Sequence, residues 1–284
     1  MVQIISDKEA IRALCEVKRS DGCRIGCVPT MGALHEGHLS LVRLAVEKTD
    51  FVVVTVFVNP SQFRPGEDLD RYPRDMKRDI ELLEPLGAHI VFAPEPAAMY
   101  TEGYATWVTV ERLTDCLCGA SRPGHFRGVA TVVAKLFNLI RPHLAVFGRK
   151  DAQQAAVIRR MVRDLDMGVE IEVAPIVREP DGLAMSSRNR YLSPGERLEA
   201  TVLHRALVEV EALARSGETS SSVLRELVRS VIAASPLAEI EYIEIVDPDE
   251  ITPLDDVTHG ALVAVAARFG KTRLIDNTLI PHTV

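Results

Sequence analysis

The segment 24–48 constrains the fold most, because it reads as a short strand, a tight turn and an amphipathic helix in immediate succession. Its first residues are mostly apolar, Pro29 cannot continue a central strand, and Gly32 permits backbone angles that other residues avoid. Beyond the turn, apolar residues recur with a largely helical period up to Lys48. We therefore expect a strand that ends at Pro29 and a helix whose first turn contains Gly37.

The start of that helix has the composition of an anion site. Free backbone N–H groups and the positive end of the helix dipole favour a negative ligand there, and Gly37 would let a phosphate approach closely. His35 and His38 offer donors to phosphate oxygens and to charge that develops in a transition state. Histidine suits this role because it can be neutral or cationic near pH 7. The alternative is that the two histidines are partly exposed caps or a fragment of a metal site.

A second segment, 185–190, reads as a mobile loop with two hydroxyls and a cation. Such groups hold a triphosphate, because hydroxyls and N–H groups donate to phosphate oxygens and a guanidinium offsets their charge. An ordinary polar turn before a helix is the simpler interpretation. If the two segments meet, they indicate attack on the α-phosphate of ATP.

Predicted strands and helices alternate through the first half of the chain. The strands fall at 24–28, 51–58, 89–92, 144–147 and 171–177. A capping box of Ser6 and Glu9 opens the first predicted helix, which reaches about Lys18. Another helix follows His38, and further helices fall at 74–86, 129–140 and 153–164. This alternation predicts an α/β fold, a Rossmann-like doubly wound parallel sheet.

The pattern changes in the second half. The sequence 193–196 supplies an N-cap, a first-turn proline and a capping glutamate for a long helix to about Arg215, and a second helix reaches Ala234. Strands are expected at 240–246, 261–269 and 273–275, with a hairpin turn at 270–271. We therefore predict a domain over 1–176 and a smaller α+β domain over 177–284. Movement of the second domain would close the 185–190 loop over ATP.

The composition excludes several kinds of protein. A net charge of −7 without a basic block argues against nucleic acid and against an anionic membrane surface as partners. The five cysteines are odd in number and lack zinc-like spacing, which fits a reducing compartment. The beginning of the chain lacks the apolar stretch of a signal peptide, and the longest apolar run, 51–58, is far short of a bilayer span. We therefore expect a cytoplasmic protein.

Six separated segments resemble pantothenate synthetases, a family of the nucleotidylyltransferase superfamily with an HxGH element and a KMSKS-like loop. They occur in the family's order and run through nearly the whole chain: PTMGALHEGHLSLV at 29–42, FVNPSQF at 57–63, DLDRYPR at 68–74, SRPGHFRGV at 121–129, FGRKDAQQ at 147–154 and DGLAMSSRNRYL at 181–192. Together these segments are far more specific than any one of them.

The resemblance implies a ligase that forms an amide bond. It would condense (R)-pantoate with β-alanine to (R)-pantothenate, with ATP split to AMP and pyrophosphate through a pantoyl adenylate, on the route to coenzyme A. It also implies a homodimer that uses ATP as its Mg²⁺ complex.

The resemblance also assigns residues. It implies His38, His35 and Lys150 as catalytic groups, Gln62 and Gln154 as pantoate-binding residues, and Gln62 as a β-alanine contact. The implied ATP contacts are Met31, Gly32, Ala33, Leu34, His35, Glu36, Gly37, His38, Gly148, Arg149, Lys150, Asp151, Val177, Met185, Ser186, Ser187 and Arg188. Tyr72, Arg122 and His125 would border the pocket, and Asp79 lies near a family metal contact, with the protein ligands of Mg²⁺ left open. Neutral amides suit pantoate, because an arginine would lower the nucleophilicity of its carboxylate.

Two positions depart from the family pattern. Arg149 stands where the family usually has glutamate, and Cys118 stands where it commonly has an acidic residue. These departures keep open a catalytically silent nucleotide-binding regulator on the same fold. A nucleotidyltransferase that makes a dinucleotide cofactor is a further alternative, against which FVNPSQF and KDAQQ argue.

Overall fold

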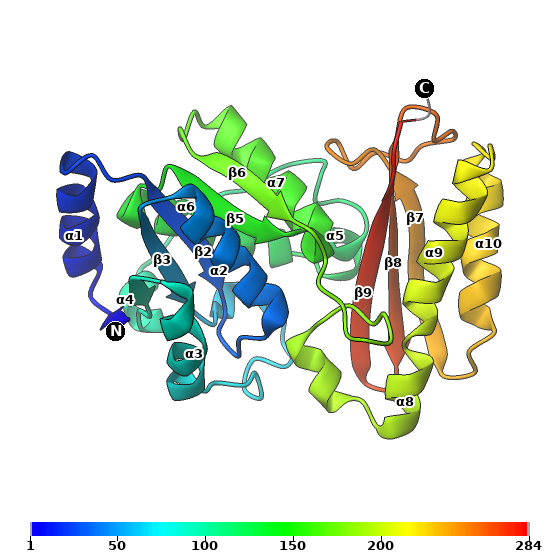
Figure 1. Cartoon of the computed structure of the whole chain (residues 1–284), viewed down its shortest axis with the longest axis horizontal. Helices are drawn as coiled ribbons and strands as arrows, with labels where there is room; N and C mark the ends of the chain where they lie inside the picture. The colour runs from blue at the N-terminus through cyan, green and yellow to red at the C-terminus, as the bar shows by residue number, and fades with distance from the viewer. Residues whose placement is uncertain (1, 283–284) are drawn as a thin grey trace.

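The computed structural model describes residues 2–282, and its first half is built around a six-stranded parallel sheet (Figure 1). The strands are β1 (Gln3–Ile5), β2 (Ile25–Thr30), β3 (Phe51–Val56), β4 (Ile90–Phe92), β5 (Leu144–Gly148) and β6 (Glu170–Ala174). They lie in the order β1-β4-β3-β2-β5-β6, and every paired neighbour is parallel. This confirms the predicted α/β class.

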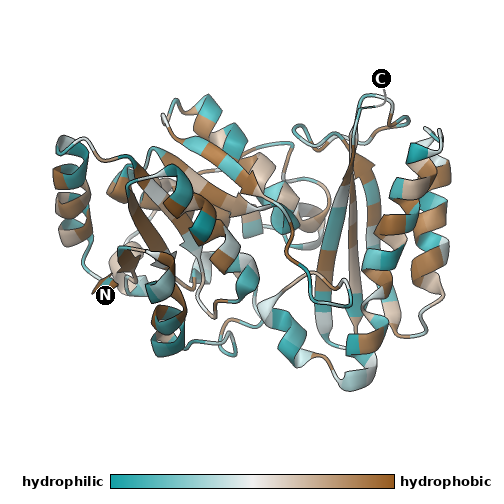
Figure 2. Ribbon diagram, in the orientation of Figure 1, coloured by the Kyte–Doolittle hydropathy of each residue, from teal (hydrophilic) through white to brown (hydrophobic). Residues whose placement is uncertain are grey.

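Helices cover both faces of this sheet, as a parallel sheet requires. One face carries α2 (Glu36–Lys48) and α3 (Met76–Leu83), and the other carries α1 (Lys8–Ser20), α6 (His125–Ile140) and α7 (Ala152–Asp164). Figure 2 shows the resulting brown central strands beneath helices with teal outer faces. Shorter helical segments are η1 (Pro60–Gln62), η2 (Glu84–Leu86), α4 (Pro96–Met99), α5 (Cys118–Ser121), η3 (Arg149–Asp151) and η4 (Ser187–Tyr191).

Two local predictions for this half were wrong, and one strand was missed. The cap of α1 is Asp7, whose carboxylate accepts from the N–H of Ala10 at 2.8 Å, so Ser6 and Glu9 do not form the predicted capping box. Strand β2 continues one residue past Pro29, because pairing with β5 has already ended at Cys27 and only β3 is paired there. Strand β1 was not predicted, because three residues are too short to show a period.

The second half forms a three-stranded antiparallel sheet in the order β7-β8-β9, from β7 (Ala238–Val246), β8 (Ala261–Phe269) and β9 (Thr272–Ile280). This confirms the smaller α+β unit. The predicted long helix after Ser193 is wrong, because it breaks at 200–201 into α8 (Pro194–Glu199) and α9 (Val202–Arg215), and α10 (Ser221–Ala233) follows. Strand β9 is also longer than predicted, because the sequence signal stopped before its polar residues Asp276 and Asn277.

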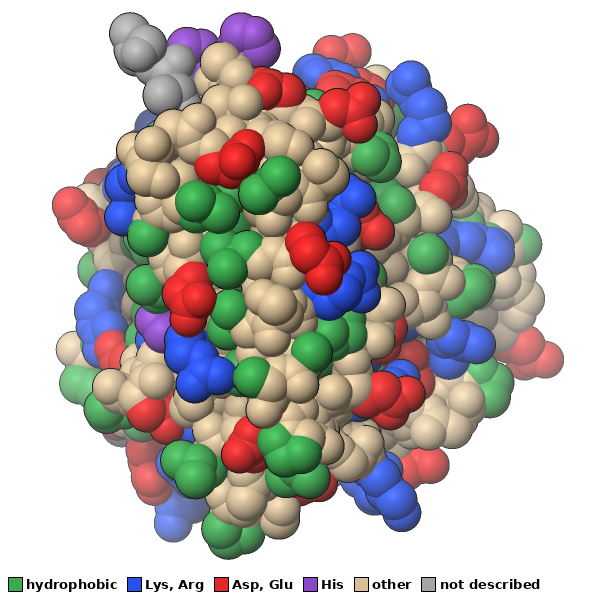
Figure 3. All heavy atoms as spheres, turned by 90° about the vertical axis from the view of Figure 1, so that its right-hand side faces the viewer, with side chains coloured by type: hydrophobic (Ala, Val, Ile, Leu, Met, Phe, Trp, Pro, Cys, Tyr) green, Lys and Arg blue, Asp and Glu red, His purple; other side chains and the backbone are tan. Residues whose placement is uncertain are grey.

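The antiparallel sheet has two buried faces. One packs on α9 and α10, and the other joins the apolar cluster of the parallel sheet through Leu262 and Ala264 (Figure 1). A domain boundary near Val177 therefore stays a prediction, since one core spans both sheets. On the outer side of this half, acidic and basic side chains are interspersed with apolar ones (Figure 3).

Candidate active site

A cavity of about 220 Å³ opens where the carboxyl ends of β2 and β5 meet. From these two strands the sheet order proceeds in opposite directions, and such a switch point is where doubly wound sheets bind ligands. The cavity brings together residues from all six family-like segments, including the loop at 185–188. Segments that lie far apart in the chain thus share one site.

His35 and His38 lie together at the start of α2, with ring centroids 4.1 Å apart. His35 Nδ1 accepts from the N–H of Gly37 at 3.2 Å, and His38 Nδ1 accepts from the N–H of His35 at 3.4 Å. The two rings therefore form a reciprocal cap of the helix. Gly37 is needed for this arrangement, because a Cβ there would lie 2.9 Å from the His35 ring.

Both rings are neutral near pH 7. Burial lowers the pKa of His38 to about 3, and burial together with the charge of Lys150 lowers the pKa of His35 to about 4. Since each Nδ1 accepts from a backbone N–H, the single proton of each ring sits on Nε2. Each histidine thus presents an uncharged N–H donor to the cavity that both rings line.

The turn before the histidines is held by a buried carboxylate. Asp79, from α3, accepts the N–H groups of Ala33 and Leu34 at 2.9 and 2.7 Å. Gly32 adopts φ +77°, and a Cβ there would lie 2.8 Å from Val56. The N–H groups of Ala33 and Leu34 therefore already donate to Asp79 in this structure. Asp79 thereby fixes the conformation of the turn.

Lys150 and Asp151 lie on η3, directly after β5, and both line the cavity. Desolvation opposes ionisation of Asp151, but the charges of Lys150 and Arg188 hold the pKa of its carboxyl below the usual range. Within residues 2–282, the Lys150 ammonium forms no ion pair, so its charge is available to an anionic ligand. The side chain of Arg149 lies outside the cavity lining.

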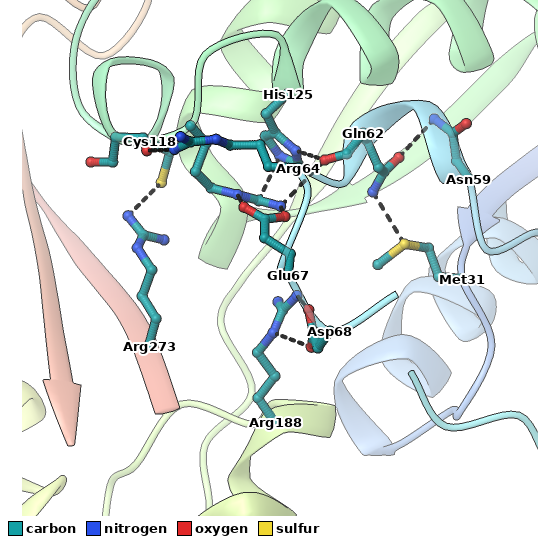
Figure 4. Close-up of polar contacts among 12 residues, drawn as sticks. Met31, Asn59, Gln62, Arg64, Glu67, Asp68, Cys118, His125, Arg188 and Arg273 are labelled. Atoms are coloured by element: carbon teal, nitrogen blue, oxygen red, sulfur yellow. Dashed lines mark hydrogen bonds and ion pairs between the residues drawn. The ribbon is translucent and has the colours of Figure 1, made fainter. Parts of the chain in front are cut away.

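Gln62 is oriented by a network of amides (Figure 4). Asn59 Oδ1 accepts from the N–H of Ser61, which fixes Asn59 Nδ2 as the donor to Gln62 Oε1 at 3.0 Å. Gln62 Nε2 then faces the sulfur of Met31 at 3.1 Å, on the wall of the cavity. The amide of Gln62 therefore offers N–H donors to a ligand.

The second predicted glutamine is also in place. Gln154 lines the cavity, whereas its neighbour Gln153 is buried and bonded to the backbone of Leu113, Cys116 and Cys118. The resemblance singled out Gln154, and the first turn of α7 places Gln154 on the cavity and Gln153 in the interior.

Arg122 and His125 hold the wall beside Gln62. Both bond its backbone carbonyl, His125 Nδ1 at 2.8 Å and Arg122 Nη2 at 3.3 Å, and Arg122 also forms a two-pronged ion pair with Glu67. Burial and the Arg122 charge lower the pKa of His125 to about 4. His125 is therefore a neutral donor to the carbonyl of Gln62, and its Nε2 accepts from Arg122.

The loop at 185–191 packs on the segment 68–72. Arg188 bonds both carboxylate oxygens of Asp68, at 3.0 and 3.1 Å (Figure 4). Ser187 Oγ lies 3.4 Å from Tyr72 Oη. The loop therefore closes one side of the cavity while the Arg188 charge is compensated by Asp68.

The structure brings most of the predicted site residues together. Those that line the cavity are Met31, His35, Gly37, His38, Gln62, Gly148, Lys150, Asp151, Gln154, Val177, Met185, Ser186, Ser187 and Arg188, together with the bordering Tyr72, Arg122 and His125. Those outside its lining are Gly32, Ala33, Leu34, Glu36 and Arg149. Glu36 instead pairs with Arg43 on the surface of α2. Asn59, Glu67 and Asp68 were not singled out, although the first and last belong to family-like segments.

Neither a metal-binding cluster nor a membrane-spanning helix is present in the described part of the chain. Between residues 2 and 282, no three His, Cys, Asp or Glu side chains are grouped so as to hold a metal ion. Over the same range, no helix has the length and apolar character needed to cross a bilayer.

Comparison with known proteins gives one family. The model of the pantoate-beta-alanine ligase family matches residues 3–279. The pantothenate synthetase of Acetivibrio thermocellus is 52% identical over 280 residues, which cover 99% of each chain. That of Roseiflexus castenholzii is 59% identical over 256 residues, 90% of this chain and 92% of the relative.

Solved structures agree with the sequence comparison. Pantothenate synthetase from Thermus thermophilus superposes with a TM-score of 0.93 at 48% identity, covering 99% of this chain and 100% of the other. The pantoate-beta-alanine ligase from Francisella tularensis, solved as a complex with beta-gamma ATP and beta-alanine, gives 0.79 at 31% identity and covers 99% and 98%. The chain therefore belongs to the pantoate–β-alanine ligase family.

Proposed function

We propose that this chain joins (R)-pantoate to β-alanine, with ATP split to AMP and pyrophosphate through a pantoyl adenylate. Family membership over residues 3–279 supports the reaction. The observation that carries the assignment of residues is the single cavity that collects His35, His38, Lys150 and the 185–188 loop around the amide of Gln62.

In the first step, a carboxylate oxygen of pantoate attacks the α-phosphorus of ATP, and the bond from that phosphorus to the pyrophosphate oxygen breaks. Lys150, with no ion pair inside the described chain, offsets the negative charge of the phosphates. The Nε2–H groups of His35 and His38 donate to phosphate oxygens as charge shifts to the leaving group. Ser186, Ser187 and the loop N–H groups hold the departing pyrophosphate.

Pantoate is held by neutral groups in this proposal. Gln62 directs its amide N–H groups into the cavity, and Gln154 lies on the same lining. Neutral donors orient the carboxylate without quenching its charge, so its nucleophilicity is retained. In the second step, the amine nitrogen of β-alanine, near Gln62, attacks the acyl carbon, the bond to AMP breaks, and the nitrogen loses a proton.

Mg²⁺ binds together with ATP, as part of the substrate complex. Asp79, the acidic residue nearest a family metal contact, has both oxygens bonded to backbone N–H groups. The described residues also offer no cluster of three acidic, histidine or cysteine ligands. We therefore place Mg²⁺ on the phosphate oxygens and water and assign it no protein ligand.

We further propose that the chain works as a homodimer in the cytoplasm. The family resemblance supports the dimer, and five free cysteines fit a reducing compartment. Light scattering at working concentration checks the dimer, and a monomer that turns over at the full rate would reject it.

The test of the proposed function is exchange of labelled pyrophosphate into ATP, with Mg²⁺ and pantoate present and β-alanine absent. Exchange that depends on pantoate establishes reversible adenylate formation, and product formation on addition of β-alanine completes the reaction. ATP binding without exchange would instead support the silent regulator. Exchange that requires a mononucleotide in place of pantoate would support the enzyme that makes a dinucleotide cofactor.

A further inference from the structure

Asn277 connects the two halves of the chain at the turn that carries Lys150. Its Nδ2 donates to the backbone carbonyls of Arg149 and Lys150, at 2.9 and 3.0 Å. The side chain is 3% exposed and comes from β9, whereas both acceptors belong to η3 after β5. One amide therefore fixes two consecutive peptide groups of the turn.

The other half of this amide has no partner. Asn277 Oδ1 is buried and forms no hydrogen bond within the described chain. An unsatisfied buried acceptor reduces stability, and an apolar side chain would avoid that loss. An asparagine at this position is therefore explained by the two hydrogen bonds that its Nδ2 donates to the backbone of η3.

The preceding residue holds the second phosphate-binding segment. Asp276 is 2% exposed and forms two hydrogen bonds with Arg178, at 2.6 and 3.0 Å. Arg178 pairs with Ala184 in a β-bridge, and the N–H of Met185 donates to Val177 at 3.0 Å, so this contact fixes the base of the 185–188 loop. Adjacent residues of β9 therefore anchor both segments that face the phosphates.

We propose that Asn277 is a positioning residue for adenylation, which acts by fixing the backbone of η3 and thereby the place of the Lys150 ammonium in the cavity. Asp276 does the same for the 185–188 loop through Arg178. The inference rests on the proposed function, because it assigns to β9 the alignment of groups that bind ATP. Misplacement by about 1 Å is enough to lower a rate by roughly a hundredfold.

The test is a double-mutant cycle between Asn277 and Lys150, measured as pantoate-dependent pyrophosphate exchange. Asn277→Ala is expected to lower the exchange rate by roughly 10- to 100-fold in the wild-type background. In a Lys150→Ala background it is expected to lower the residual rate less than about twofold, because the group it positions is gone. Equal effects in the two backgrounds would overturn the proposal.

A matched control separates positioning from loss of stability. Thr278 is the next residue of β9, and its hydroxyl donates to Glu211 of α9, on the opposite face of the strand. Thr278→Val also removes a side-chain hydrogen bond but is expected to leave the exchange rate unchanged. Asn277→Leu, which retains side-chain volume, serves as a second variant, and unfolding midpoints show that each protein is folded.

The results of this test distinguish a failure of the positioning role from a failure of the proposed function. If the wild-type protein shows no pantoate-dependent exchange, the proposed function fails first. If it shows exchange and folded Asn277→Ala and Asn277→Leu retain the full rate, the proposed function stands and the positioning role of Asn277 is rejected.

Discussion

Arg188 binds Asp68 with two hydrogen bonds, Nε to Oδ2 at 3.0 Å and Nη2 to Oδ1 at 3.1 Å, although the residues are 120 positions apart (Figure 4). The pair joins the loop at 185–191 to the segment that contains Tyr72. Since Arg188 lines the cavity, a triphosphate must compete with Asp68 for the same guanidinium. We therefore expect the Asp68 carboxylate to weaken ATP binding.

Asp68→Asn is expected to lower the KM for ATP by about threefold or more, because the neutral amide leaves the Arg188 charge to the phosphates. Steady-state kinetics at saturating pantoate and β-alanine measure the change. Asp181→Asn is the matched control, since Asp181 pairs in the same two-pronged way with Arg197 outside the cavity lining. A higher KM in Asp68→Asn would mean instead that the pair holds the loop in the conformation that binds ATP.

His38→Ala is expected to lower the adenylation rate by roughly 10²- to 10³-fold, the usual cost of losing one donor to a charged transition state. Pyrophosphate exchange measures the rate, and circular dichroism checks the fold. His259→Ala provides the control, because His259 is exposed and lies outside the cavity lining. Near-normal exchange in His38→Ala would remove this histidine from the mechanism.

Acidification is expected to destabilise the protein before its carboxylates titrate. Burial lowers the pKa values of His35, His38 and His125 to about 4, 3 and 4, below the ordinary 6.5. Between these values the unfolded chain binds more protons than the folded one, so the free energy of unfolding falls as pH falls. Each histidine contributes a slope of up to about 1.4 kcal/mol per pH unit.

Urea unfolding between about pH 7 and pH 5 measures that slope. His125→Asn removes one titrating group while leaving an amide to donate to the carbonyl of Gln62. In this variant, the free energy of unfolding is expected to depend less steeply on pH, by about the contribution of one histidine. An unchanged slope would show that the pKa of His125 is the same in the folded and the unfolded protein.

The parts of the site that follow a strand could be predicted from the sequence. The turn after β2, the pair His35 and His38, and the turn after β5 are each encoded within a few consecutive residues, and parallel strands bring their carboxyl ends to one edge. The structure places His35, His38 and Lys150 on one cavity. Gln62 was assigned from the resemblance to the family, and its place just after a predicted strand agrees with that assignment.

The partnerships between distant segments could not be predicted. Nothing near Asp68 in the sequence indicates Arg188, and nothing near Asn277 indicates the carbonyls of η3, because these contacts depend on how the two sheets pack.

The wrong predictions for single residues have causes within the neighbouring sequence. Asp7 and Ser6 are both good N-caps one residue apart. The resemblance implies Arg149 as an ATP contact, but it does not reveal that this residue lies outside the cavity lining.

Asp79→Ala is expected to lower both stability and activity. Asp79 is 1% exposed, and its loss leaves the N–H groups of Ala33 and Leu34 unpaired in a buried turn. Two such donors cost about 2–6 kcal/mol in the free energy of unfolding, measured by urea titration. Exchange activity should fall as well, because this turn places His35.

A metal ligand would behave differently, since its loss raises the Mg²⁺ concentration needed for half-maximal exchange. We expect that concentration to stay unchanged in Asp79→Ala, because both carboxylate oxygens are bonded to the backbone, and a tenfold rise would reassign Asp79 to the metal.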